Sequence, residues 1–290
     1  MANSIVKPFK GVVSLSYKIL GMGTNEKPKP PIFMLHGVIG HKDQLSGIGK
    51  TILNITRRTV VVVDQRNHGD SPHTNSHKYT EQAADVLHLF ERLGARQSTL
   101  VGYGMGGRTA MAVALTAPEQ VAGLLVMDMS PISIPVDYEN SVLKLLEGMK
   151  DVDFKKADVL SKAKAEARLQ LKKFNTNEAI MSLVVSNIRQ KPDGTFGWIC
   201  NIDVLLKHFK HWMTFPECYK QKVYDGPTLF IGGQVSDFIP PDELNIIRVM
   251  FPRAVITYIK SAGHCVYVDD PRSCLEKMIP FIRSNHFRTK

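Results

Sequence analysis

The sequence predicts an α/β fold with a mainly parallel, doubly wound sheet and a helical cap inserted late in the chain. Short apolar runs such as 31–35 and 59–63 have the composition of strands that are buried on both faces. They alternate with longer segments whose apolar residues recur at helical spacing, as in 80–93. Residues 132–222 contain several helical patterns and no run of buried-strand type. A length of 290 residues suits one large domain that carries an insertion.

The strands expected in the first quarter of the chain are followed by loops rich in glycine and polar residues. Residues 13–19 alternate apolar and polar side chains like a first strand. The apolar run 31–35 stops at His36-Gly37-Val38-Ile39-Gly40, and the run 59–63 stops at a polar loop that extends to Pro72. Such loops at the carboxyl ends of parallel strands are where an α/β sheet places its functional residues.

The second half of the core repeats this arrangement. A strand at 98–101 leads into the hexapeptide 102–107, which opens a helix that Ala117-Pro118 ends. Small residues in this helix, Ala110, Ala112 and Ala114, allow it to pack close to the sheet. Further strands are expected just before Asp128, at 227–231 and at 254–259. We therefore predict a core made of residues 1–131 and 223–290, with residues 132–222 forming the cap over the site.

Composition is that of an ordinary globular chain. Apolar residues make up 43% and charged residues 22%, and no apolar run approaches the roughly 18 residues that a membrane helix needs. The four cysteines form no C-x-x-C pair and no zinc-type spacing, so we expect reduced thiols in an intracellular protein, with no metal and no cofactor.

Much of the net charge of +10 falls between Phe154 and Phe174. The apolar positions in this segment recur at helical spacing, which predicts an amphipathic helix with a basic outer face. That face is expected to be solvated, with an acidic protein partner or an anionic membrane surface as the alternatives. No nucleic-acid-binding module is recognisable, so nucleic acid is not expected as a partner. The apolar positions are Ala157, Leu160, Ala163, Ala167 and Leu171.

The hexapeptide Gly102-Tyr103-Gly104-Met105-Gly106-Gly107 has two interpretations. It spells G-x-G-x-x-G, the phosphate-binding fingerprint of dinucleotide-binding folds, and Asp128 lies where a ribose-binding carboxylate would follow. With serine in place of Gly104 it would instead be G-x-S-x-G, the nucleophile elbow of α/β-hydrolases. The dinucleotide interpretation leaves the loops after residues 35 and 63 unexplained, so we favour the elbow.

Later motifs agree with the hydrolase interpretation. Ser261-Ala262-Gly263-His264 follows the last expected strand, which is where the general base of that fold belongs, and the chain order nucleophile, acid, histidine is also that of hydrolases. From about Val13 onward the chain resembles the abhydrolase-domain-containing protein eleven group. The matching segments are His36-Gly37, 64–72, the elbow, Asp128-Met129-Ser130-Pro131, Gly232-Gly233 and Ala262-Gly263-His264.

This resemblance implies a serine esterase or lipase acting on small esters or acylglycerols, and a mitochondrial location, with the cytoplasm as the alternative. It assigns His264 as base and Asp128 as acid, with Asp237 as the alternative acid. The oxyanion hole would use the backbone N–H groups of Val38 and Met105. The chain departs from the group at Gly104, where the nucleophile position has no side chain.

Other polar residues near these motifs are expected to have structural roles or none. His36, His68 and Asp64 should organise loops, and His41, His73 and His77 should lie at the surface. Cys265 is a poor replacement nucleophile, because its side chain should diverge from that of its neighbour His264.

We therefore expect a hydrolase-family protein whose activity is impaired and which binds a small ester or lipid ligand or a partner, as a pseudoenzyme. The alternatives are slow hydrolysis by water that His264 activates, and dinucleotide binding at the glycine-rich turn. Whether the chain is an enzyme, and whether Gly104 is natural or introduced, stays open at this point.

Overall fold

The computed structural model describes residues 11–22, 29–174 and 177–284. Its main sheet has seven strands in the order β1-β3-β2-β4-β5-β8-β9, and β1 is antiparallel to β3 while the other neighbours are parallel. This confirms the predicted mainly parallel sheet. The strands are β1 (Tyr17–Gly21), β2 (Ile32–Leu35), β3 (Val60–Val63), β4 (Ser98–Tyr103), β5 (Val121–Met127), β8 (Thr228–Gly233) and β9 (Ala254–Ile259).

The central strands separate two hydrophobic cores. Side chains alternate across a strand, so Phe33 and Leu35 of β2 enter one core while Ile32 and Met34 enter the other. All four are fully buried. A strand buried on both faces must be apolar at every position, which is why 31–35 and 59–63 appear in the sequence as continuous apolar runs.

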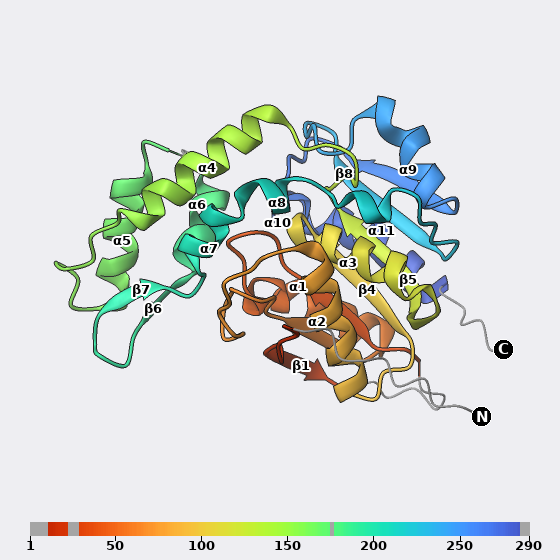
Figure 1. Cartoon of the computed structure of the whole chain (residues 1–290), viewed down its shortest axis with the longest axis horizontal. Helices are drawn as coiled ribbons and strands as arrows, with labels where there is room; N and C mark the ends of the chain where they lie inside the picture. Colours follow the sequence, from red (N-terminus) through yellow and green to blue (C-terminus); the bar gives the residue numbers. More distant parts are fainter. Residues whose placement is uncertain (1–10, 23–28, 175–176, 285–290) are drawn as a thin grey trace.

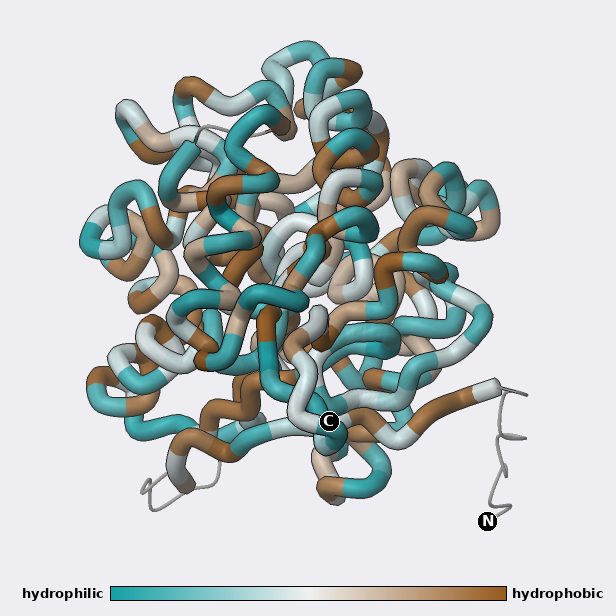
Figure 2. The backbone as a smooth tube through the Cα atoms, turned by 90° about the vertical axis from the view of Figure 1, so that its left-hand side faces the viewer, coloured by the Kyte–Doolittle hydropathy of each residue, from teal (hydrophilic) through white to brown (hydrophobic). Residues whose placement is uncertain are grey.

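Helices cover both faces of this sheet (Figure 1). α2 and α3 contact each other on one face, and α1 contacts α11 on the other. Along the helices, hydrophobic and hydrophilic stretches alternate, as Figure 2 shows, because only one side of each helix faces a core. The core helices are α1 (Ser46–Thr56), α2 (Tyr79–Arg92), α3 (Met105–Thr116), α9 (Leu244–Met250), α10 (Val266–Asp269) and α11 (Pro271–Ser284). Short 3₁₀ helices lie at Lys42–Leu45, Pro118–Gln120, Glu217–Tyr219 and Pro241–Glu243.

Between β5 and β8 the chain forms a largely helical insertion that extends to one side of the sheet in Figure 1. Its helices are α4 (Val136–Lys150), α5 (Leu160–Leu171), α6 (Glu178–Val185), α7 (Ile202–Lys207) and α8 (Phe209–Met213). It also contains an antiparallel hairpin of β6 (Ile188–Gln190) and β7 (Phe196–Trp198), where the sequence predicted no strand. β6 and β7 have only three residues each, too few for a periodic pattern to show.

The basic helix is shorter than predicted. α5 begins at Leu160 rather than near Phe154, because the preceding residues form a turn in which the Lys155 N–H donates to Asp153 Oδ1. The predicted inward positions Ala163, Ala167 and Leu171 are fully buried. Leu160 is 40% exposed, and Ala157 precedes the helix. In the described residues, no helix has both the length and the apolar character needed to cross a membrane.

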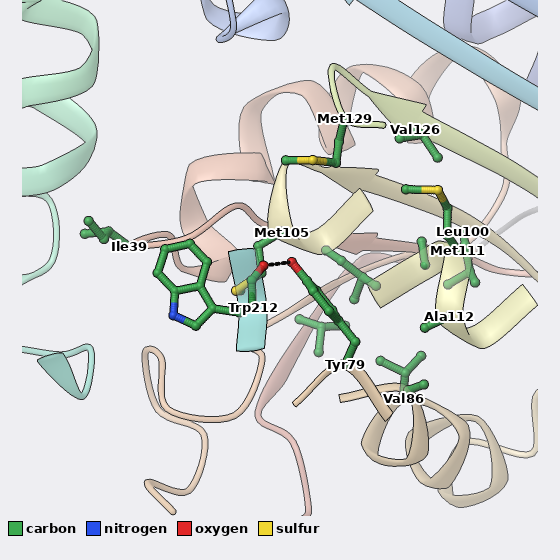
Figure 3. Close-up of a cluster of buried hydrophobic side chains, with 14 of the residues drawn as sticks. Ile39, Tyr79, Val86, Leu100, Met105, Met111, Ala112, Val126, Met129 and Trp212 are labelled. Carbon is green, nitrogen blue, oxygen red and sulfur yellow. Dashed lines mark hydrogen bonds between the residues drawn. The ribbon is translucent and has the colours of Figure 1, made fainter. Parts of the chain in front are cut away.

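Arg108 of α3 fixes both ends of the insertion to the core. Its fully buried guanidinium donates to the carbonyls of Ser130 and Ser133, where the chain leaves the core, and of Met213, near the point of return. Nearby, the Tyr79 hydroxyl donates to the carbonyl of Trp212 at 2.7 Å, the dashed bond in Figure 3. The insertion is therefore anchored to helices α2 and α3, close to the elbow.

Candidate active site

The elbow is the turn from β4 into α3. β4 ends at Tyr103, α3 begins at Met105, and Gly104 between them has φ 53° and ψ −120°. L-residues with a side chain rarely adopt a positive φ, and when they do it is a recognised sign of strain at a functional site. The backbone therefore has the sharp strand-to-helix geometry that the sequence predicts here.

The glycines that flank Gly104 are required by packing. A Cβ atom at Gly102 would lie 2.2 Å from the carbonyl oxygen of Gly106, and one at Gly106 would lie 2.3 Å from that of Leu35. At Gly104 the nearest atoms to an added Cβ are Gly37 Cα and His264 Nε2, both at an ordinary 3.7 Å. Close approach of backbones accounts for Gly102 and Gly106, the outer glycines of the elbow pattern G-x-S-x-G, without any bound phosphate.

His264 is paired with Asp128. The distance from His264 Nδ1 to Asp128 Oδ2 is 2.8 Å, and the Asp128 carboxylate is fully buried. Asp128 follows β5 with φ 46°, a conformation that Asp tolerates better than most residues. The Gly233 N–H and the Ser236 hydroxyl both donate to its carboxylate, at 2.9 and 2.5 Å. The alternative acid, Asp237, is exposed, so the carboxylate against His264 is that of Asp128.

Aromatic rings surround the His264 imidazole. Phe238 stacks on it with ring centroids 3.7 Å apart and an interplanar angle of 14°. Tyr138 from α4 meets both rings edge-on, and Tyr103 lies on the β4 side. With its Nδ1 on Asp128 and its faces packed, the ring presents Nε2 to the empty side of Gly104.

The turn after β2 lies across from the elbow, as an oxyanion hole requires. Gly37 Cα is the nearest backbone atom to the Cβ position of Gly104. Within the described residues the Val38 N–H has no hydrogen-bond acceptor, and Met105, as the first residue of α3, has an N–H that no helical carbonyl can accept. Ile39 follows with φ 55°, a strained value for a β-branched residue, and its carbonyl accepts the Asn187 side-chain N–H from the insertion at 2.6 Å.

A cavity opens beside His264 between the core and the insertion. About 700 Å³ of empty space lies in it when the solvent at its mouth is included. Its walls are mostly aliphatic side chains from the turn after β2 and from α4 and α6. The lining residues are Gly37, Val38, Ile39, Gln44, Tyr103, Tyr138, Ser141, Val142, Leu145, Ile180, Leu183, Val184, His264 and Cys265.

Cys265 lines the same cavity but is not poised as a nucleophile. Its Sγ lies 3.2 Å from the Tyr103 hydroxyl oxygen. Burial raises the pKa of the thiol to about 11, so very little thiolate, the reactive form, exists at neutral pH.

The neighbouring polar loop is organised by Asp64, His36 and His68. Asp64 accepts from the backbone N–H and the ammonium group of Lys42 and from the Asp70 N–H. His36 Nε2 accepts from the Gln65 N–H, and His68 Nδ1 lies 3.0 Å from the Arg66 carbonyl oxygen. Burial lowers the pKa of both histidines to about 3.

Of the three histidines predicted at the surface, His73 is exposed and His41 is half-buried. His77 is fully buried, so that prediction is wrong. Its ring packs against His68, and its Nε2 lies 3.3 Å from Met105 Sδ, because the segment between Pro72 and α2 folds back onto the start of α3.

Sequence reasoning missed Phe238, Tyr138 and Arg108. The aromatic residues reach His264 from distant segments, which no local pattern reveals. Arg108 did leave a signal, since it is the one charged residue in the otherwise small and apolar helix 105–116. Among the described residues, no three His, Cys, Asp or Glu side chains lie close enough together to hold a metal ion.

Comparison with known proteins agrees with this geometry. The chain is 34% identical to the sn-1-specific diacylglycerol lipase ABHD11 of Mus musculus, over 92% of this chain and 85% of that protein. It is 29% identical to ethanol acetyltransferase 1 of Cyberlindnera jadinii, over 97% and 90%. A solved marine microorganism esterase matches with a TM-score of 0.82 and 26% identity, covering 93% of this chain and 99% of the esterase. These matches confirm the resemblance to the abhydrolase-domain-containing protein eleven group. Because residues 30–271 also match the family described as alpha/beta hydrolase fold, the chain belongs to that family.

Proposed function

We propose that this chain is an ester- or lipid-binding member of its family that has lost the nucleophile and turns over esters poorly or not at all. The observation that carries the proposal is Gly104, which occupies the centre of the elbow and faces His264 Nε2 with no side chain. Loss of the serine from a triad costs about a factor of a million in turnover. Relatives that include a diacylglycerol lipase and a marine esterase support an ester or acylglycerol as the ligand class.

The rest of the site supports retained binding. In the proposed roles, Asp128 orients His264 and stabilises its imidazolium, and the Val38 and Met105 N–H groups form the oxyanion hole. The carboxylate keeps two further donors, Gly233 and Ser236. A site whose only defect is one missing hydroxyl still holds an acyl group.

Slow hydrolysis is the second candidate, because the His264–Asp128 pair is intact. His264 Nε2 would take a proton from a water molecule at the open side of Gly104, and that water would attack the ester carbonyl without an acyl-enzyme. The carbonyl oxygen would accept the developing negative charge in the oxyanion hole, and the alcohol would leave with the proton from His264.

Steady-state assays of the native chain and of His264→Gln, with p-nitrophenyl butyrate and a diacylglycerol, separate the two candidates. The binding role predicts that neither protein releases hydrolysis products faster than buffer alone does, and that both proteins still bind the ester. Release by the native chain that His264→Gln abolishes would replace the binding role with slow hydrolysis. Native release with a pre-steady-state burst would contradict both, since a burst requires a covalent intermediate.

The basic outer face of α5 supports an anionic membrane surface as a partner. Leu169 is 71% exposed on this helix, next to the exposed Lys172 and Lys173, and apolar residues among lysines are typical of helices that lie in a membrane interface. Co-sedimentation with phosphatidylserine vesicles tests this, and a Lys172→Glu/Lys173→Glu variant should sediment less. A mitochondrial location stays a proposal, which fractionation of cells expressing the chain tests.

A further inference from the structure

The cavity beside His264 has an apolar body and one polar end. Val142 and Leu145 of α4 and Leu183 and Val184 of α6 line its apolar body. None of its described lining residues is acidic, and none is Lys or Arg, so the His264 imidazole is the one basic side chain among them. Gln44, Ser141 and Tyr103, three of the other polar residues, already have partners. Gln44 donates its amide protons to Leu183 and Ser186, and the Tyr103 hydroxyl is bonded to Cys265.

The His264 ring and the turn after β2 border the empty side of Gly104. His264 Nε2 has no hydrogen-bond partner in the described part of the chain, and it lies 3.7 Å from the position of a Gly104 Cβ. Gly37 Cα lies equally close to that position, so the turn that contains Gly37 and Val38 borders the space, and Met105 follows Gly104 directly in the chain. A serine hydroxyl at position 104 would have filled this space and formed a hydrogen bond there. Without that hydroxyl, a ligand there meets His264 Nε2 and the two N–H groups proposed for the oxyanion hole, those of Val38 and Met105.

A carboxylate oxygen and an unprotonated Nε2 are both hydrogen-bond acceptors, so a carboxylate on His264 requires one proton between them. Asp128 lies on Nδ1 and stabilises the imidazolium. Three other titratable groups near the ring, Tyr103, Tyr138 and Cys265, stay neutral near pH 7, because burial raises their pKa values. A fourth, Asp269, accepts a hydrogen bond from the Gly263 N–H.

We propose that this site binds the carboxylate of a straight-chain aliphatic acid, with one oxygen on His264 Nε2, the other on the Val38 and Met105 N–H groups, and the chain between α4 and α6. The inference rests on the proposed loss of the nucleophile, since an elbow serine would occupy the space for the first oxygen. A charge-assisted pair with imidazolium is stronger than a neutral hydrogen bond, so an acid should bind better than the matching alcohol or ester. Binding takes up a proton.

Isothermal titration calorimetry of the native chain with octanoate tests the proposal. Titrations in two buffers of different ionisation enthalpy should show uptake of up to about one proton per octanoate, depending on pH, and affinity should fall as the pH rises, by up to about tenfold per pH unit. Octanol should bind about tenfold more weakly or worse, a difference of about 1.4 kcal/mol. Equal affinities for octanoate and octanol, or binding with no proton uptake at any pH, would overturn the proposal.

Two substitutions test where the carboxylate and the aliphatic chain of the ligand bind. Gly104→Ser places a hydroxyl in the space proposed for the carboxylate and should weaken octanoate binding, whereas octanol affinity should change little. Leu183→Trp, at a half-buried position on the cavity wall, should weaken octanoate and dodecanoate more than butanoate. Leu169→Trp on the exposed face of α5 is the matched control and should bind all three like the native chain. If folded Leu183→Trp binds octanoate and dodecanoate as the native chain does, the aliphatic chain lies elsewhere, which would contradict the proposal.

The same samples separate this inference from the proposed function. p-Nitrophenolate release is measured beside the titration. If the native chain turns over the ester and octanoate inhibits it competitively, the binding-only role fails and the carboxylate site stands. If nothing is turned over and octanoate does not bind, the carboxylate site alone fails.

Discussion

Replacing Gly104 by serine should convert this chain into an esterase. A Cβ atom added at Gly104 would lie 3.7 Å from Gly37 Cα and 3.7 Å from His264 Nε2, so the hydroxyl fits and reaches the imidazole. The positive φ of 53° makes any side chain there strained, at a cost of about 1–3 kcal/mol in folding stability. Against that cost, a nucleophile in a working triad is worth about a factor of a million in turnover. We expect Gly104→Ser to gain on the order of a thousandfold or more in p-nitrophenyl butyrate hydrolysis, with that factor of a million as its ceiling.

Gly104→Ala is the matched control, because it carries the same backbone strain and no hydroxyl. Both variants should lose similar stability in urea unfolding, and only the serine variant should gain activity and a pre-steady-state burst. Adding His264→Gln to the serine variant should remove the gain. If folded Gly104→Ser is no more active than Gly104→Ala, then the pair His264–Asp128 and the oxyanion groups do not form a working site, and the reasoning from geometry is refuted.

Three further predictions concern the frame of the site. Gly106→Ala should destabilise the fold by about 3 kcal/mol or more, since its Cβ would meet the Leu35 carbonyl at 2.3 Å; urea unfolding no worse than that of Gly104→Ala would contradict this. Arg108→Met removes the donors from three carbonyls, each worth about 1–3 kcal/mol when left unpaired, and should expose the insertion to limited proteolysis while the native chain resists. Stability should fall as the pH drops below about 6.5, because the unfolded chain then binds protons that His36 and His68, with pKa values lowered to about 3, refuse in the folded state. The slope is up to about 1.4 kcal/mol per pH unit for each histidine, and unfolding curves at several pH values should show a smaller slope for His68→Gln.

The fold was predictable where one physical constraint dominates the sequence. A strand buried on both faces must be apolar throughout, so 31–35 and 59–63 predict β2 and β3 within a residue or two. The start of α5 was less predictable, because Ala157 and Phe154 continue the helical spacing while Asp153 forms a turn with Lys155. Local propensity and a side-chain hydrogen bond compete there, and the spacing alone does not show which prevails.

The site was predictable in its polar residues and not in its surroundings. Asp128 and Asp237 both follow strands, and only the three-dimensional path of the chain, with φ 46° at Asp128, decides which one reaches His264. The burial of His77 and the stacking of Phe238 on His264 depend on contacts between segments far apart in the chain. Such contacts leave no periodic signature, since each involves a single residue.

Labelling with a fluorophosphonate, followed by intact-mass analysis, tests the central claim most directly, because the reagent forms a stable covalent bond to an activated nucleophile in a hydrolase site. We predict that the native chain gains no mass, and that Gly104→Ser gains one label, mapped to position 104 and lost when His264→Gln is added. One label on the native chain at a residue lining the cavity would show that another nucleophile has taken over, and would contradict the claim that the site lost its nucleophile at Gly104.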